Sequence, residues 1–327
     1  MYLNGSGPLG VLIIGEPGSG KSAIMSQLIC SPRSSLLIHN NIIGYHMCDY
    51  SEKGKRDGAR FVRNLVDQIA GSIPEYSDFV TSNEQVKKVL EKRCESDTVG
   101  CFYDAVVGPL RELKSQPDSL KYIFIDALDE CLEKDRKSST ILEILKNKLS
   151  LFPNWLKIIL SSRNWTTVIE KLPQSVKRVV LDPVDKRNLE DIHFYIRYVW
   201  FQNSFFMDRL LEAMVGFTSK LDGIRVNSLI NEMSRNGEGN FLYVKTSLEY
   251  LNASEGRINL QSFPTSLYDI YNIYFERQFG KDEFSNYKLL FEVLLAARSP
   301  LKLTEIASIL KQPTSLLSEL LQQVSSF

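Results

Sequence analysis

The segment Gly15–Ser22 constrains the fold of this chain more than any other feature. Its residues read GEPGSGKS and fit the pattern GxxxxGK[ST] in full. The apolar run Val11–Ile14 precedes it and the helical pattern Ala23–Leu28 follows it, which is the strand–loop–helix context that this phosphate-binding motif requires. The pattern therefore predicts a phosphate-binding loop, or Walker A motif, between a buried strand and a helix.

Each residue type in this loop suits the binding of a nucleotide. Glycine permits backbone conformations and close approaches that a Cβ would obstruct, so backbone N–H groups can surround a β-phosphate. Lys21 offers its ammonium group to the β- and γ-oxygens, and Ser22 offers its hydroxyl to Mg²⁺. The candidate nucleotide-binding residues here are Gly15, Glu16, Pro17, Gly18, Ser19, Gly20, Lys21, Ser22 and Ala23.

A second motif is the acidic end of the apolar run Tyr122–Asp126, which is typical of a Walker B strand. Open α/β sheets bind their ligands at the carboxyl ends of the strands, so Asp126 is the predicted carboxylate for Mg²⁺, acting through a water. Asp129 and Glu130 follow closely and are the candidate catalytic residues, one of which would orient or deprotonate an attacking water. The alternative for both is a helix cap or a solvent-facing position.

A strand is expected between the phosphate-loop strand and the Asp126 strand, because Ile42–Cys48 is followed by a helical pattern. With an acid after the magnesium aspartate, this order is typical of the "additional strand, catalytic glutamate" branch of P-loop proteins. In that branch the next strand lies beside the phosphate loop and ends in a polar sensor. Here Lys157–Ser161 leads to Arg163, so Arg163 is the candidate contact to a γ-phosphate, with a surface arginine as the alternative.

The identity of the base has less support in the sequence. Asn147–Ser150 reads NKLS and lacks the aspartate of the NKxD segment with which GTPases recognise guanine. No ABC-type signature occurs either. Adenine is therefore favoured, and ATP or ADP with Mg²⁺ is the predicted ligand.

The whole chain divides into two regions of different character. From Leu9 to Leu181 short β-rich runs alternate with helical patterns, which predicts a parallel α/β sheet. After Asp182 the sequence is typical of helices joined by polar turns. The expected fold is an α/β, parallel-sheet P-loop NTPase domain followed by an all-helical half. The predicted strands are Leu9–Ile14, Ile42–Cys48, Lys121–Ile125, Leu156–Ser161 and Arg178–Leu181.

Charge, cysteine spacing and apolar runs bear on the expected partners, metal sites and location of the protein. Lys+Arg and Asp+Glu are 39 each, so net charge gives no argument for a nucleic-acid partner. The five cysteines are scattered without a CxxC pair, which suits a reducing compartment and gives no metal-site spacing. The N-terminus lacks a signal peptide pattern, and the apolar run Ile192–Phe206 is too short to cross a bilayer. A cytoplasmic protein without membrane insertion is expected.

Together, GEPGSGKS, IFIDALDE and the strand ending in SSR resemble a NACHT module, the nucleotide domain of the signal-transducing ATPases called STAND proteins. GNFLYV at Gly239–Val244 and the segment Phe263–Phe279 resemble the family's helical linker. The chain is similar in particular to the large ankyrin-repeat scaffold proteins, including the tetratricopeptide, ankyrin and coiled-coil type. The segment FPNWLKIILSSR is one that carries this similarity.

The resemblance implies three parts: a nucleotide-binding domain at 1–183, a helical domain at 184–262 and a truncated winged-helix domain at 263–327. It implies that ADP holds the helical parts closed and that exchange for ATP opens them for assembly. Pro264 stands where the family's linker proline approaches the base, although a helix-entry proline is an equal alternative. Protein partners are expected through repeat regions absent from this sequence, together with nucleotide-dependent self-association.

Two residues depart from the family pattern. Ala127 replaces the glycine usual after the magnesium aspartate, and no histidine follows His193, so the winged-helix histidine that often contacts phosphate is missing. Two functions stay open: an ATP-driven switch with slow hydrolysis, and a non-hydrolysing scaffold stabilised by its nucleotide. A small-molecule kinase is disfavoured, because no acceptor site or arginine-rich lid is evident.

Overall fold

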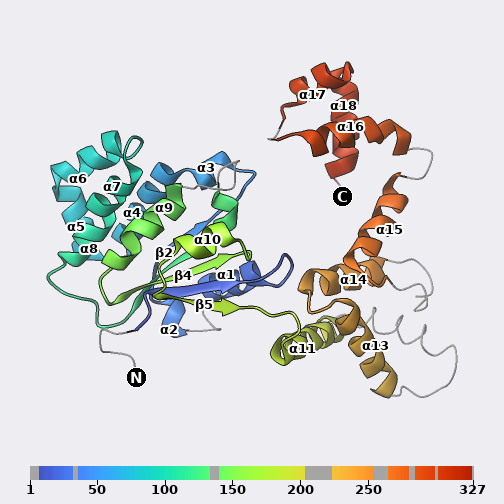
Figure 1. The fold of residues 1–327 in the computed structure, drawn as a ribbon, viewed down its shortest axis with the longest axis horizontal. Helices are drawn as coiled ribbons and strands as arrows, with labels where there is room; N and C mark the ends of the chain where they lie inside the picture. Colours follow the sequence, from blue (N-terminus) through green and yellow to red (C-terminus); the bar gives the residue numbers. More distant parts are fainter. Residues whose placement is uncertain are drawn as a thin grey trace. The chain divides into compact units, whose positions relative to one another are not determined.

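The structure, a computed structural model, describes residues 7–31, 36–132, 140–202, 223–253, 264–279, 284–298 and 301–325. The chain divides into two compact units, Met1–Asp182 and Pro183–Phe327, which are described here one at a time (Figure 1). The expected boundary between residues 262 and 263 stays a prediction, because residues 254–263 lie outside the described ranges.

The first unit contains a five-stranded parallel sheet in the order β2-β3-β4-β1-β5. Every predicted strand is present, and β5 begins two residues before the predicted Arg178. The α/β parallel-sheet fold expected from the sequence is therefore confirmed. The strands are β1 (Gly10–Ile14), β2 (Ile42–Met47), β3 (Lys121–Asp126), β4 (Leu156–Ser162) and β5 (Val176–Val180).

The strand between β1 and β3 is β4, as the register shows: Ile159 pairs with Val11 on one side and with Phe124 on the other. The run Ile42–Cys48 forms β2, which lies between β1 and β3 along the chain as expected and at the edge of the sheet beyond β3 in space. The strand Lys157–Ser161 lies beside β1 and its phosphate loop, as the sequence also predicted. Strand order depends on packing and not on order along the chain. The insertion of β4 brings the carboxyl ends of β1, β4 and β3 side by side, where the candidate residues lie.

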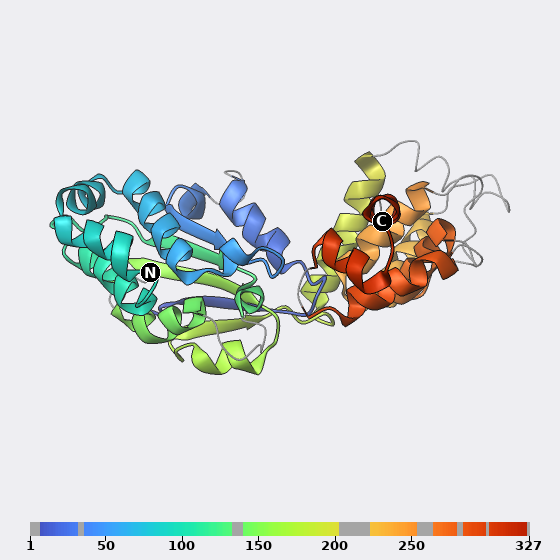
Figure 2. The same ribbon diagram turned by 90° about the horizontal axis from the view of Figure 1, so that it is seen from above.

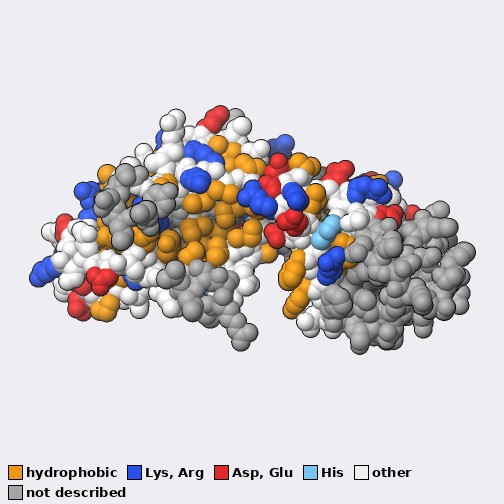
Figure 3. Space-filling model, turned by 90° about the horizontal axis from the view of Figure 1, so that it is seen from below, with side chains coloured by type: hydrophobic (Ala, Val, Ile, Leu, Met, Phe, Trp, Pro, Cys, Tyr) orange, Lys and Arg blue, Asp and Glu red, His pale blue; other side chains and the backbone are white. Residues whose placement is uncertain are grey.

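The larger core of this unit covers one face of the sheet. The apolar face of α4 (Gly58–Ser72) is buried there except for the partly buried Ala70, and α9 (Thr140–Lys148) packs beside it. The other face is covered by α1 (Lys21–Cys30) and α2 (Leu36–His39) around Ile13, Met25 and Phe124 (Figure 2). This second cluster is smaller, and hydrophobic side chains remain visible over part of the unit in Figure 3.

The segment between β2 and β3 contains helices joined by turns and no strand. Two disulfides occur in this unit: Cys94–Cys101 within the helical segment, and Cys48–Cys131 between the end of β2 and the turn after β3. Cys94 and Cys101 are 7 residues apart, and Cys48 and Cys131 are 83 residues apart, which explains why spacing alone revealed no pairs. The helices are α3 (Lys53–Arg56), α4, α5 (Pro74–Ser82), α6 (Glu84–Lys88), η1 (Val89–Arg93), α7 (Thr98–Phe102), η2 (Tyr103–Val107) and α8 (Gly108–Arg111).

The described residues of the second unit form helices and no strand, which agrees with the predicted change of character after Asp182. A turn at residues 237–240 separates α13 from α14: Glu238 and Gly239 have φ of 46° and 78°, and the Asn240 side chain caps α14. The helices are α11 (Lys186–Gln202), α13 (Gly223–Asn236), α14 (Phe241–Ala253), α15 (Leu267–Phe279), α16 (Phe284–Ala296), α17 (Leu303–Leu310) and α18 (Thr314–Ser325).

Among the described residues, none of the helices combines the length and the apolar character needed to cross a membrane.

Candidate functional site

The phosphate loop joins β1 to α1 and takes its shape from two left-handed glycines. Gly18 has φ of 80° and Gly20 has φ of 89°, a region that favours glycine, and Gly20 forms the N-cap of α1. The Ser19 N–H donates to the Glu16 carbonyl at 3.1 Å, and the Gly15 N–H donates to the Ser162 carbonyl at 3.3 Å. The loop is therefore closed on itself and fixed to the end of β4.

The Ser19 hydroxyl is a buried polar group without a hydrogen-bond partner in the described structure. Only 6% of Ser19 is exposed. Buried hydroxyls nearly always have a partner, so an orphan of this kind needs an explanation. A phosphate oxygen in the loop would accept from this hydroxyl, and the residues present therefore fit the phosphate group that the sequence predicts.

Lys21 turns back over the loop. Its ammonium group donates to the Gly15 carbonyl at 2.7 Å and to the Glu16 carbonyl at 2.9 Å. Burial lowers the pKa of the Lys21 ammonium group, and the nearby carboxylates of Asp129 and Asp126 partly offset this effect. The charge of Lys21 thus lies between the loop and the acidic strand end. Ser22 is exposed in the first turn of α1, where its hydroxyl is accessible.

The acidic turn begins at Asp126, the last residue of β3, and continues through Ala127 and the 3-10 helix η3 (Leu128–Cys131). Asp126 is buried, with 6% exposure, and accepts a short hydrogen bond from the Ser161 hydroxyl of β4. The same hydroxyl accepts from the Ala127 N–H at 2.8 Å. Ser161 therefore fixes both the predicted magnesium carboxylate and the start of the turn.

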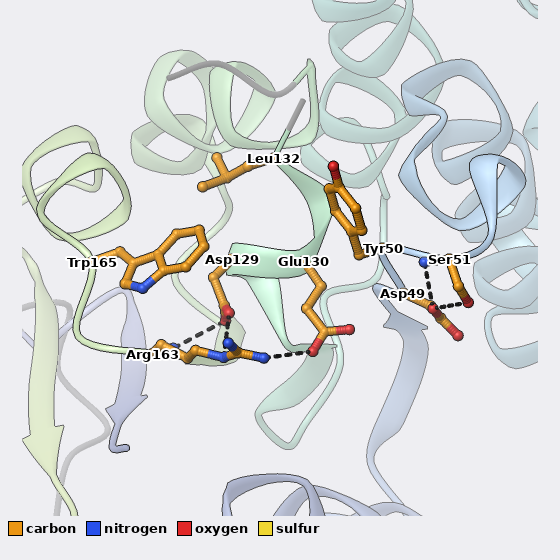
Figure 4. Close-up of a pocket in the computed structure, with 8 residues that line it drawn as sticks. All are labelled: Asp49, Tyr50, Ser51, Asp129, Glu130, Leu132, Arg163 and Trp165. Atoms are coloured by element: carbon orange, nitrogen blue, oxygen red, sulfur yellow. Dashed lines mark hydrogen bonds and ion pairs between the residues drawn. The ribbon is translucent and has the colours of Figure 1, made fainter. Parts of the chain in front are cut away.

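Arg163, the residue that follows β4, is paired with both candidate catalytic acids (Figure 4). Its backbone N–H donates to Asp129 at 3.0 Å, its Nε lies 3.1 Å from the Asp129 carboxylate, and a terminal nitrogen lies 3.4 Å from the Glu130 carboxylate. Asp129 is only 4% exposed. The structure thus brings together Arg163, Asp129 and Glu130, and their predicted roles toward nucleotide stay predictions.

A cavity of about 340 Å³ opens beside this ion-paired group (Figure 4). Asp49, Tyr50 and Ser51 enter it from the end of β2 and were not among the sequence candidates. Their position directly after a predicted parallel strand was the available signal, since carboxyl ends of parallel strands meet at one edge. The lining residues are Asp49, Tyr50, Ser51, Asp129, Glu130, Leu132, Arg163 and Trp165.

Pro264 lies in the second unit, where its carbonyl accepts a hydrogen bond of 2.6 Å from the Tyr243 hydroxyl. This bond fixes the entry to α15, so the structure supplies a local role for the residue. Its approach to a base stays a prediction.

Comparison with known proteins gives two findings. Residues 3–163, just under half of the chain, match the family described as "Nephrocystin 3, N-terminal". The chain is also 22% identical over 306 residues to the vegetative incompatibility protein HET-E-1 of Podospora anserina, an alignment that covers 92% of this chain and 21% of that protein. The chain spans about a fifth of the length of this relative. These two matches and the five-stranded parallel sheet support a NACHT-class P-loop module in this chain.

Proposed function

We propose that the chain is an ATP/ADP-binding switch with slow ATP hydrolysis that controls the assembly of proteins in the cytoplasm. The observation that carries the proposal is the meeting of the phosphate loop with the acidic turn. β4 alone separates β1 from β3, so the loop after β1 and the end of β3 share one edge of the sheet, where the carboxylates of Asp129 and Asp126 act on the Lys21 ammonium group. The nucleotide-binding signalling or scaffold class to which NACHT modules belong supports the same reading.

In this proposal the loop Gly15–Ala23 holds the phosphates through its backbone N–H groups and the Ser19 hydroxyl. Lys21 leaves the Gly15 and Glu16 carbonyls and bonds the β- and γ-oxygens instead. Ser22 and Asp126 hold Mg²⁺, which neutralises charge on the phosphates when bound. Asp126 is already oriented by Ser161, so the carboxylate needs little rearrangement for this role.

The proposed hydrolysis is slow because both candidate acids are paired in the structure. Glu130 contacts Arg163 at 3.4 Å, and Asp129 is held by the Arg163 backbone and side chain. A general base must be within reach of the water that it deprotonates. Glu130 acts only after Arg163 turns away from it toward the γ-phosphate, and this extra step lowers the rate.

The second candidate is a scaffold module that binds nucleotide without hydrolysing it. The same ion pairs favour this alternative if Arg163 never releases Glu130. In either case the expected partners are nucleotide, proteins bound through repeat regions outside this sequence, and further copies of the chain in the ATP-bound state. For both candidate functions we propose that the protein neither inserts into a membrane nor binds nucleic acid.

Three measurements test the proposal. Nucleotide released by denaturing freshly purified protein should be ADP or ATP, and guanine nucleotide would contradict the choice of base. Turnover of ATP with Mg²⁺ should be slow and should vanish in Glu130→Gln but not in Glu112→Gln, an exposed control. Retention of nucleotide without turnover in the unmodified protein would support the scaffold instead.

A further inference from the structure

The disulfide Cys48–Cys131 joins the edge strand to the acidic turn. Cys48 directly follows β2, and Cys131 is the last residue of η3, with the two Cα atoms 5.2 Å apart. The Cys48 N–H also donates to the Asp126 carbonyl at 3.0 Å. The bond therefore ties the turn that carries Asp129 and Glu130 to a second strand end, and the two cysteines are the sequence neighbours of Asp49 and Leu132, which line the cavity.

We propose that Cys48 and Cys131 form a reversible oxidation site that controls the acidic turn of the nucleotide site. The inference rests on the proposed function, because the turn matters only if it acts on bound nucleotide. Disulfides in cytoplasmic proteins are usually transient and respond to redox conditions. The cytoplasmic location expected from the sequence therefore fits a bond that forms and breaks.

The position of Cys131 explains how the bond acts on the site. Glu130 is its neighbour, Asp129 lies two residues away, and both carboxylates are paired with Arg163. The disulfide fixes the end of η3 and so holds both acids in the arrangement that engages Arg163. Reduction removes this restraint, and Arg163 becomes more available to a γ-phosphate. The oxidised form should therefore distinguish ATP from ADP less well.

The surroundings of the two sulfurs favour a disulfide over a metal ion. His46, Cys48 and Cys131 lie close enough for three ligand atoms to fall within 4.8 Å of one another. However, the His46 Nε2–H donates to the Lys55 carbonyl at 2.8 Å, so this nitrogen is not available to a metal in that arrangement. The same carbonyl lies 3.4 Å from the Cys131 sulfur and can accept from its S–H after reduction. Both redox states are thus accommodated.

The oxidant is a low-molecular-weight disulfide such as oxidised glutathione. The Cys48 thiolate, which keeps 6% exposure against 1% for Cys131, attacks one of its sulfurs, breaks its S–S bond and releases one small thiolate. The Cys131 thiolate then attacks the Cys48 sulfur, forms the Cys48–Cys131 bond and releases the second. Two electrons pass from the protein to the small disulfide, and the two protons of the protein thiols end on the released small thiols.

The experiment compares the protein after dithiothreitol and after oxidised glutathione. Peptide mass mapping should find a linked Cys48–Cys131 peptide only after oxidation. In titrations with Mg²⁺, oxidation should reduce the preference for a non-hydrolysable ATP analogue over ADP by about fivefold, and dithiothreitol should restore it. Cys131→Ser should abolish both the linked peptide and the change in preference.

Two variants serve as matched controls. Cys94→Ser removes the other disulfide, and Cys30→Ser removes an exposed thiol; both should keep the redox response. A Cys48–Cys131 peptide that is absent after oxidation, or that forms while the preference stays constant, overturns the proposal. One equivalent of zinc in the reduced protein, lost in Cys131→Ser, overturns it in favour of a metal site. If neither the oxidised nor the reduced protein binds nucleotide, both the redox proposal and the proposed function are wrong. If both forms bind nucleotide tightly and with the same preference for the ATP analogue over ADP, only the redox proposal is wrong.

Discussion

The phosphate loop takes its shape from the conformation of its own backbone, whereas the acidic turn takes its shape from residues far along the chain. Lys21 contacts carbonyls five and six residues away, and Gly18 and Gly20 adopt left-handed conformations between them. Asp126 is held by Ser161 and Asp129 by Arg163, at separations of 35 and 34 residues. Apart from the Gly15 N–H bond to the Ser162 carbonyl, the loop is thus a local structure, whereas the turn is a tertiary one.

This difference separates the functions that each part can serve. Among the described residues, the Ser19 hydroxyl of the loop has no hydrogen-bond partner and the Lys21 ammonium group donates to two carbonyls, so the loop is prepared for an anion. The turn has its acids already bonded to Ser161 and Arg163, so it must rearrange before Glu130 or Arg163 acts on a ligand. Binding is therefore expected to depend on the loop, and discrimination between ATP and ADP on the turn.

The largest expected effect tests the loop. Lys21→Ala should weaken nucleotide binding by about a hundredfold or more, because charge-assisted hydrogen bonds contribute about 1.5–3 kcal/mol each and Lys21 would make more than one. A titration with fluorescent nucleotide measures the change. Lys157→Ala, at another half-buried lysine whose pKa burial lowers, is the matched control and should bind normally. Unchanged nucleotide affinity in Lys21→Ala would show that Gly15–Ser22 is not a phosphate-binding loop.

The second prediction tests Asp126, a residue of the acidic turn that is proposed to hold Mg²⁺ together with Ser22 of the phosphate loop. Asp126→Asn should weaken binding by about a hundredfold with Mg²⁺ and little without it, since groups that hold a metal through water contribute about 10–100-fold to its affinity. The asparagine still accepts from the Ser161 hydroxyl, so the turn should stay folded. An equal loss with and without Mg²⁺ would show that Asp126 is structural only.

The third prediction concerns Arg163, the residue that the turn holds. Arg163→Ala should leave ADP affinity nearly intact and weaken a non-hydrolysable ATP analogue by about tenfold. A γ-phosphate bond contributes about 1.5–3 kcal/mol, and the lower end applies because Arg163 must first leave Asp129 and Glu130. Arg187→Ala, at an exposed arginine paired with Asp185, is the control and should change neither affinity. Equal losses for both nucleotides would make Arg163 a support of the turn alone.

The sequence predicted the local structure well and the tertiary network poorly. The phosphate loop and the apolar strands could be predicted because each is encoded by a short stretch of consecutive residues. The Arg163 pairing with Asp129 and Glu130 was not, because a γ-phosphate and a carboxylate both attract a guanidinium and the sequence does not show which lies nearer. Tyr50 and Cys48 were missed for the same reason: their roles depend on the strand order, which places β2 beside β3.

The smallest predicted effect tests the turn by itself, at the residue that departs from the family pattern. Ala127 has φ of 53°, a left-handed conformation that costs an L-residue about 1–2 kcal/mol and glycine almost nothing. Glycine also loses about 0.4–1 kcal/mol more conformational entropy on folding, so Ala127→Gly should raise the free energy of unfolding by about 0.5–1 kcal/mol. Denaturant unfolding measures it. Ala70→Gly, inside the right-handed helix α4, should instead lower the free energy by about 1 kcal/mol. If both variants are destabilised alike, the strain at Ala127 is absent, and the bonds to Ser161 and Arg163 alone determine the shape of the turn.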